Sequence, residues 1–195
     1  NALTNNNTGI NNVAIGFRSQ EANQGGEQNV SLGVFTLLKN NGGDWNTAIG
    51  MQALHENVTG DGNTAVGSAA LRNNTASQNT AVGLQSMMNT TSGAANSALG
   101  YMSLDTNTTG NNNTALGHTA DVAANNLVNA TAIGYGAIVG SSNSIQLGNS
   151  SVNLVNTTGV LSATGANISG AVTATAFSGD GSALTNLPSS GANNQ

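Results

Sequence analysis

The chain has 195 residues, of which only 6% are charged and 3% aromatic, and its formal net charge is −5. Its three basic residues, Arg18, Lys39 and Arg72, are too few and too scattered to neutralise a phosphate backbone, so the composition excludes nucleic-acid binding. Cysteine is absent, which excludes disulfides and thiolate metal sites, and no apolar stretch approaches the ~18 residues that cross a bilayer, so we expect no membrane insertion by this segment.

A five-residue phrase, Asn-x-Ala-(Ile/Val/Leu)-Gly, recurs along residues 12–148. Its glycines are spaced 17 residues apart, with one interval of 16 between Gly67 and Gly83 and a variant copy that ends at Gly148. A fixed period this short is typical of stacked supersecondary units. The clearest copies supply these candidate structural positions: Asn46, Ala48, Gly50, Asn63, Ala65, Gly67, Asn79, Ala81, Gly83, Asn113, Ala115 and Gly117.

Each copy predicts a turn, a short strand over the phrase, a second short strand and a polar return. A small residue stands three positions after the glycine, and a large apolar residue such as Leu54 or Ile138 stands four positions after it. Gln20 and Asp121 break this second pattern. Because strands of ~4 residues are unstable alone, we expect each unit to hydrogen-bond to the next in parallel ladders.

The sequence therefore predicts an all-β fold, a parallel β-roll (β-solenoid) of about nine 17-residue rungs over residues 1–148. At about 4.8 Å per rung, the roll would be roughly 40 Å long. In-register stacking would let the asparagine amides form hydrogen-bonded ladders. Alternation places Ala48 on the face opposite Thr47 and Ile49, but the sequence leaves open which face is buried.

The period stops after Gly148, and we expect a neck or shaft of short strands over 149–188, followed by a disordered tail or linker over 189–195. The chain begins at Asn1 without a methionine, so we expect it to be a piece of a longer protein.

The phrases NTAIG, NTAVG and NSALG, each followed by a small and a large apolar residue, resemble the head repeats of trimeric autotransporter adhesins. They are also similar to repeats of phage and phage-like tail-fibre proteins, as is VTATAFSGDGSALTNLP at 172–188. The resemblance covers roughly 12–148, although adhesin heads use a shorter repeat, so we expect longer turns here. It implies a homotrimeric parallel β-roll that is extracellular, at a cell surface or in a virion tail fibre.

The candidate reactive residues do not converge. His55 and His118 occupy different positions in the repeat and would not stack as a metal pair, and the loops at Asp61 and Asp180 each carry one carboxylate, which favours turns over calcium sites. Asp44 and Asp61 could stack on adjacent rungs, and Asp105 and Asp121 only approximately. We therefore predict no catalytic, cofactor or metal residues, and no enzyme.

Two surface features leave alternatives open. Trp45 could stack on a sugar ring as a surface contact, but we favour a side chain that plugs the gap between neighbouring turns. A row of threonines, with Ser97 among them, would suit ice binding if it faced outward: Thr47, Thr64, Thr80, Thr114 and Thr131.

The leading hypothesis is a non-enzymatic adhesin head or tail-fibre shaft that presents a surface to a host-cell receptor or glycan. The alternative is a purely structural, self-assembling filament subunit, and an ice-binding solenoid is a third possibility.

Overall fold

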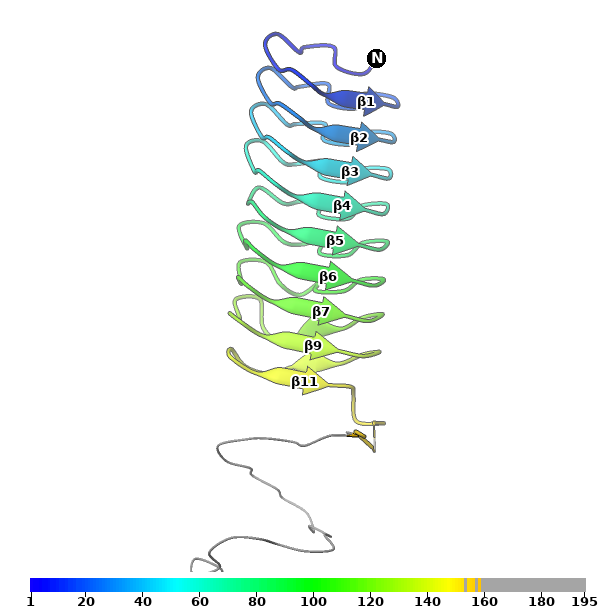
Figure 1. Cartoon of the computed structure of the whole chain (residues 1–195), viewed down its shortest axis with the longest axis vertical. Coiled ribbons are helices and arrows are strands. Elements are labelled where there is room, and N and C mark those ends of the chain that lie inside the picture. The colour runs from blue at the N-terminus through cyan, green and yellow to red at the C-terminus, as the bar shows by residue number, and fades with distance from the viewer. Residues whose placement is uncertain (153, 157, 159–195) are drawn as a thin grey trace, which may run out of the picture. The chain divides into compact units, whose positions relative to one another are not determined.

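Each copy of the repeat contributes one strand to a single parallel sheet in the computed structural model, which describes residues 1–152, 154–156 and 158. The strands lie one above another in Figure 1. The sheet contains β1 (Val13–Ile15), β2 (Val30–Leu32), β3 (Thr47–Ile49), β4 (Thr64–Val66), β5 (Thr80–Val82), β6 (Ser97–Leu99), β7 (Thr114–Leu116), β9 (Thr131–Ile133) and β11 (Ile145–Leu147). A second, two-stranded sheet contains β8 (Asp121–Val122) and β10 (Ile138–Val139). The described residues contain no helix, and hence none that could cross a lipid bilayer.

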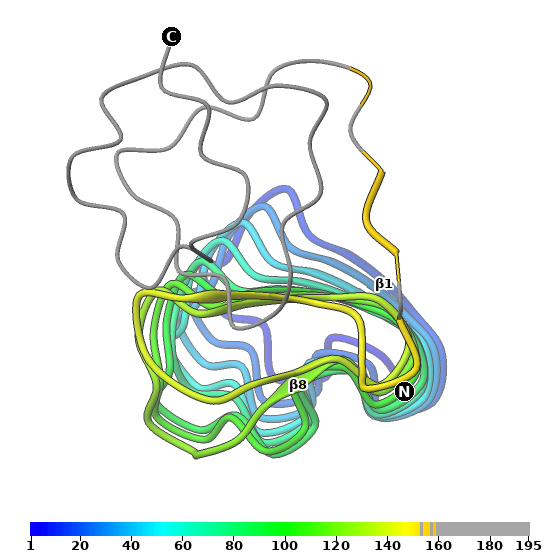
Figure 2. The same cartoon turned by 90° about the horizontal axis from the view of Figure 1, so that it is seen from below.

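Neighbouring strands pair with equivalent residues side by side. Ala48 pairs with Ala65, and Ile49 pairs with Val66. The 16-residue interval does not disturb this register, because Ala65 pairs with Ala81. The predicted all-β parallel solenoid is therefore confirmed. Seen along the stack in Figure 2, the strands form one long wall, and β8 lies in the wall opposite.

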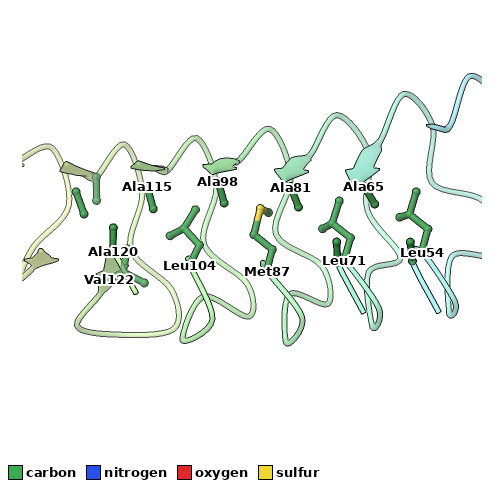
Figure 3. Close-up of a cluster of buried hydrophobic side chains, with 14 of the residues drawn as sticks. Leu54, Ala65, Leu71, Ala81, Met87, Ala98, Leu104, Ala115, Ala120 and Val122 are labelled. Carbon is green, nitrogen blue, oxygen red and sulfur yellow. The ribbon is translucent and has the colours of Figure 1, made fainter. Parts of the chain in front are cut away.

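The interior is thin because the sheet contributes only small side chains to it. The central alanine of β3, β4, β5, β6, β7 and β9 faces inward and is buried, whereas the residues on either side of it face outward. Figure 3 shows Ala65 and Ala81 pointing toward Leu71 and Met87, which come from the opposite wall. All four of these side chains are fully buried. The structure thus assigns alanine to the interior, and leucine or methionine fills the space across from it.

The predicted second strand is wrong for the first six rungs. In the third rung, for example, Gln52 and Leu54 have left-handed φ values of 61° and 51°. This curl turns the consecutive residues Ala53 and Leu54 both inward, with 0% exposure each. A strand could not do so, since its successive side chains point to opposite faces.

Only the last rungs have extended residues in this wall, at β8 and β10, and there the inward position moves by one residue. Val122 and Val139 are 2% exposed and fill the interior. Ile138, which the sequence pattern placed among the large apolar row, is instead 58% exposed. Because successive side chains of a strand point to opposite faces, Val139 in β10 points inward and Ile138 points outward.

The motif asparagines join each rung to the next. The backbone N–H of Asn46 donates to Asn29 Oδ1 at 2.9 Å, and Asn46 Nδ2 donates to the Gly60 carbonyl of the following rung at 2.8 Å. The amide ladder is also direct, because Asn63 Nδ2 donates to Asn46 Oδ1 at 3.1 Å. The predicted asparagine ladder is therefore confirmed, and it satisfies polar groups that would be costly to bury alone.

A second asparagine ladder lies in the return segment and was missed from the sequence. Asn40 Nδ2 donates to Asn23 Oδ1 at 3.2 Å and to the carbonyl of Gly43, three residues ahead, at 2.9 Å. Asn57 Nδ2 repeats the pattern with Asn40 Oδ1 and Gly60, both at 2.9 Å. The recurring Asn-x-x-Gly spacing is the signal that could have revealed it.

The strands of the roll end at Leu147, inside the predicted range 1–148, and residues from Asn1 to Val155 form one compact unit. The predicted tail at 189–195 lies outside the described residues. So does most of the predicted neck at 149–188, of which the structure describes only residues 149–152, 154–156 and 158. These two domain assignments stay predictions.

Candidate interaction surface

Three rows of side chains cover the outer face of the large sheet and the corner beside it. The threonine row is the residue before each motif alanine, and it contains Val13, Val30, Thr47, Thr64, Thr80, Ser97, Thr114, Thr131 and Ile145. The aliphatic row is the residue after that alanine: Ile15, Leu32, Ile49, Val66, Val82, Leu99, Leu116, Ile133 and Leu147. The corner row follows the motif glycine: Phe17, Val34, Met51, Ser68, Leu84, Tyr101, His118 and Tyr135.

Every member of the aliphatic row is a large apolar side chain, and seven of the nine are exposed, whereas Val66 and Val82 are half-buried. Leu99 is 50% exposed and Leu116 is 44% exposed. The corner row continues the apolar surface, since Met51 and Leu84 are also exposed. Single exposed apolar residues are ordinary, but seven of them in one row of a sheet are not.

Aromatic side chains stack in the corner row near the end of the roll. The ring centroids of Tyr101 and His118 are 4.9 Å apart, and those of His118 and Tyr135 are 5.4 Å apart. This stack was not predicted from the sequence. Its signal is an aromatic or imidazole ring directly after the motif glycine in three consecutive copies.

No aspartate, glutamate, lysine or arginine occurs in any of the three rows. The charged side chains of the described residues lie elsewhere, partly in ion pairs such as Lys39 with Glu56 at 2.6 Å; Glu56 also forms a 2.8 Å hydrogen bond with His55 Nδ1. The hydrogen bond from Lys39 is the main cause that lowers the pKa of Glu56. Depletion of charge is the compositional feature that marks the centre of protein interfaces.

A shallow depression lies on this face over β5 to β7. It is lined by Thr80, Val82, Ser97, Ala98, Leu99, Thr114, Ala115 and Leu116. The threonine and aliphatic rows form its two sides, so the depression runs between them.

The threonine row faces outward and in register, which the sequence could not decide. Thr47, Thr64 and Thr131 are half-buried, whereas Thr80 and Thr114 are exposed. Their hydroxyls therefore form a line on the outer face of the sheet.

Trp45 does not plug a gap between turns, which was the interpretation that the sequence favoured. Its side chain is 60% exposed. The indole Nε1 donates a 2.6 Å hydrogen bond to Gln28 Oε1 on the preceding rung, which ties the ring to the neighbouring side chain.

The acidic residues fall into two stacked groups. Asp44 Oδ1 accepts the Glu27 backbone N–H at 2.7 Å, and Asp61 Oδ1 accepts the Asp44 N–H at 2.8 Å, so the predicted stacking on adjacent rungs is confirmed. Asp121 accepts the N–H groups of Val122 and Thr106. Burial raises the pKa of Asp121, and burial together with the charge of Asp121 raises the pKa of Asp105.

The described residues hold no group of three or more histidine, aspartate or glutamate side chains placed to bind a metal ion. His55 contacts Glu56, and His118 lies in the aromatic stack. The two histidines therefore take part in separate contacts. Asp180 lies outside the described residues.

Comparison with known proteins adds no family: no family model, no curated protein and no solved structure matches this chain significantly.

Proposed function

We propose that this chain is a segment of an extracellular fibre, an adhesin head or a tail-fibre shaft, in which three copies pack side by side. In this proposal the fibre is non-enzymatic and carries or contributes a surface that binds a host-cell receptor or glycan. It would lie at a cell surface or in a virion tail fibre. The resemblance of the repeated phrase supports the kind of protein, and the charge-free outer face supports the lateral packing.

The observation that carries the proposal is the exposed aliphatic row. Side chains such as Leu32, Leu99 and Leu116 each keep about half of their surface in water in the single chain. Covering apolar area contributes about 25 cal/mol per Å². A face that holds such side chains on rung after rung, with no charge among them, therefore favours association.

A second copy of this chain is the occupant that fits the row best. The side chains repeat along the stack at about 4.8 Å, the spacing of hydrogen-bonded strands. An identical roll has the same spacing, so its side chains can interdigitate over the full length of the row. A partner that is not itself a stack of hydrogen-bonded strands would fall out of step after a few rungs.

Three parallel copies would give the fibre three identical binding surfaces. Linked sites bind far more tightly than one site alone, because after the first contact the others face a high effective concentration of receptor. A stiff rod suits this role, since little conformational freedom is lost when it binds.

The native mass of the protein tests the packing. We expect a trimer in analytical ultracentrifugation, and we expect Leu116→Lys, in the aliphatic row, to convert it to a monomer because burying an unpaired ammonium is costly. Val58→Lys is the matched control, since Val58 is 40% exposed but lies at a bend outside the three rows. A wild-type monomer, or a trimer that Leu116→Lys leaves intact, would contradict the proposal.

A purely structural filament subunit remains the alternative, because lateral packing would serve it equally well. Binding of the isolated segment to cells and to a glycan array separates the two. Saturable binding supports the receptor-binding fibre, and a complete lack of binding by a folded trimer supports the filament.

Ice binding is favoured by one observation, the outward and in-register threonine row. Regular hydroxyls on a flat sheet could order water, but this surface would have to stay free of a second copy. Thermal hysteresis at high protein concentration, lost in Thr80→Tyr, would support ice binding, and its absence would remove it.

A further inference from the structure

Trp45 belongs to a stacked row of residues that precede the motif asparagine: Gln28, Trp45, Gly62 and Gln78 on four consecutive rungs. All four have left-handed backbone conformations, with φ values of 56°, 55°, 63° and 64°. This region is uncommon for residues other than glycine and is a strained position for a bulky side chain. The same position is also left-handed on other rungs, for example at Ala95 and Asn112, so this conformation belongs to the repeat, and what differs between rungs is the side chain that it presents.

The indole of Trp45 is tethered on one side and open on the other. Its Nε1 donates to Gln28 Oε1 on the preceding rung at 2.6 Å, and its side chain is 60% exposed. On the following rung stands Gly62, and a Cβ placed there would meet nothing within 4 Å. The row therefore lacks one side chain directly beside Trp45.

This missing side chain leaves a slot, which we define as the space over Gly62 between Trp45 and Gln78. The two side chains stand two rungs apart, about 9.6 Å between backbone positions. After the thickness of the side chains is subtracted, the slot fits one compact group, such as a methylated ammonium.

The residues next to this row are acidic at the same rungs. Asp61 precedes Gly62, and its Oδ1 accepts the Asp44 N–H at 2.8 Å, which holds the carboxylate at the backbone of the preceding rung, one residue before Trp45. Asp44 and Glu27 continue the line toward the preceding rungs, joined by a 2.7 Å hydrogen bond. Among the described residues, none of the ion pairs involves these three carboxylates.

We propose that the slot between Trp45 and Gln78 binds an alkylammonium group, such as the trimethylammonium of choline. A cation is attracted to the face of an indole, and quaternary ammonium ions are recognised by aromatic side chains in this way. The Asp61 carboxylate supplies the complementary charge, and the same charge disfavours acidic sugars. This site goes beyond the fibre proposal, because it lies before the strand, whereas the aliphatic row lies at the other end of the strand.

Trp45 is the only tryptophan in the chain, so its fluorescence reports on the slot directly. We expect choline chloride to cause a saturable change in emission, measured at constant ionic strength against sodium chloride. The uncharged carbon isostere of choline, 3,3-dimethyl-1-butanol, and neutral hexoses should cause no saturable change. An equal response to the isostere, or a stronger response to a hexose, would overturn the proposal.

Two pairs of variants test the geometry. Asp61→Asn keeps the oxygen that accepts the Asp44 N–H but removes the charge, and should weaken choline binding about fivefold, whereas Asp105→Asn, away from the slot, should not. Gly62→Asn fills the slot with a residue that tolerates left-handed φ and should abolish binding. Ala95→Asn, at the same repeat position on another rung with φ 56°, is its control.

Circular dichroism establishes that each variant folds, and Asp61→Asn decides the outcome if Gly62→Asn does not fold. Unchanged choline affinity in Asp61→Asn, or an absence of saturable binding in the wild-type protein, overturns the proposal. Neither result bears on the native mass, so failure here is distinguishable from failure of the trimer.

Discussion

Replacing Gly50 by alanine is expected to break the solenoid at its third rung, whereas the same change at Gly42 in the preceding turn is expected to be harmless. Gly50 has φ +121°, and a Cβ placed on it would lie 2.6 Å from the carbonyl oxygen of Gly67 on the next rung. Gly42 has no positive φ, and nothing lies within 4 Å of a Cβ placed there. The two glycines therefore differ in both the conformation and the space available.

The expected loss at Gly50 is the sum of two effects. An unfavourable φ costs about 1–3 kcal/mol, and forcing a methyl group into a packed site costs about 1–3 kcal/mol more. The contact cannot be relieved cheaply, because the neighbour is backbone and Gly67 N–H is bonded to Ile49 carbonyl at 2.7 Å. We therefore expect a loss of about 4 kcal/mol, a large part of the ~5–15 kcal/mol that holds a typical domain folded.

Gly62→Ala provides an intermediate case, since Gly62 has φ +63° but open space around it. Its expected cost is about 1 kcal/mol. Gly42→Ala should be neutral or stabilise by up to about 1 kcal/mol, because alanine restricts the unfolded chain.

Urea unfolding followed by circular dichroism measures the series. With a slope of about 2 kcal/mol/M, the Gly50→Ala midpoint should fall by about 2 M. Equal midpoints for Gly50→Ala and Gly42→Ala would refute the reasoning, because they would show that neither φ nor the rung contact restricts this position.

Three further outcomes are expected. Leu71→Ala should lower the free energy of unfolding by about 3 kcal/mol through a cavity, and Leu84→Ala, at an exposed position, by much less; similar urea midpoints would argue against a packed interior. The double variant Gln20→Leu and Ser31→Ala should raise the free energy of unfolding by about 1 kcal/mol, because Gln20 Oε1 is buried without a hydrogen-bond partner. A lower urea midpoint for the double variant would contradict this. Burial raises the pKa of Asp121, so this group's stabilising contribution is present at acidic pH and is lost as pH rises through the folded-state value. Asp121→Asn should therefore be more stable than wild type at neutral pH, with the difference vanishing near pH 3; melting curves that differ equally at both pH values would contradict it.

The sequence predicts the stacking because the period leaves little choice. Short strands that recur every 17 residues can satisfy their backbone groups only by pairing with equivalent strands, which fixes the register. The motif asparagines follow for the same reason, since Asn46 and Asn63 must then lie beside each other. These predictions needed no knowledge of which side chains are buried.

The inward face could not be predicted because polarity gives the wrong indication. In Thr47-Ala48-Ile49 the most apolar residue, Ile49, points outward, and the small Ala48 points inward. The reason is volume: Leu54 and its equivalents already fill the interior from the other wall, so only a methyl group fits opposite.

The wall that carries Leu54 could not be predicted because its conformation contradicts local preference. Leucine and glutamine rarely adopt left-handed φ, yet Gln52 and Leu54 both do. Only the stacking of one curl on the next enforces it, and stacking of this kind is not visible in a single copy. In the last rungs, at Asp121 and again at Ile138, the wall contains a short strand in place of the curl.

In a stacked fold, the surfaces available for binding are rows of equivalent residues. Such a row can be identified only when it is known which positions of the repeat face outward. The sequence contains ten charged residues within 1–158, and they are spread along it with no evident pattern. Once coiled, every one of them avoids the threonine, aliphatic and corner rows, although those rows run past every rung. The motif residues that define the repeat, such as Ala65 and Gly67, are meanwhile committed to the interior and to contacts between rungs, and so are unavailable for recognition. Binding sites are therefore to be sought at the positions that vary between copies. In this chain the clearest such position is Gly62, which has no side chain where the neighbouring rungs carry Trp45 and Gln78.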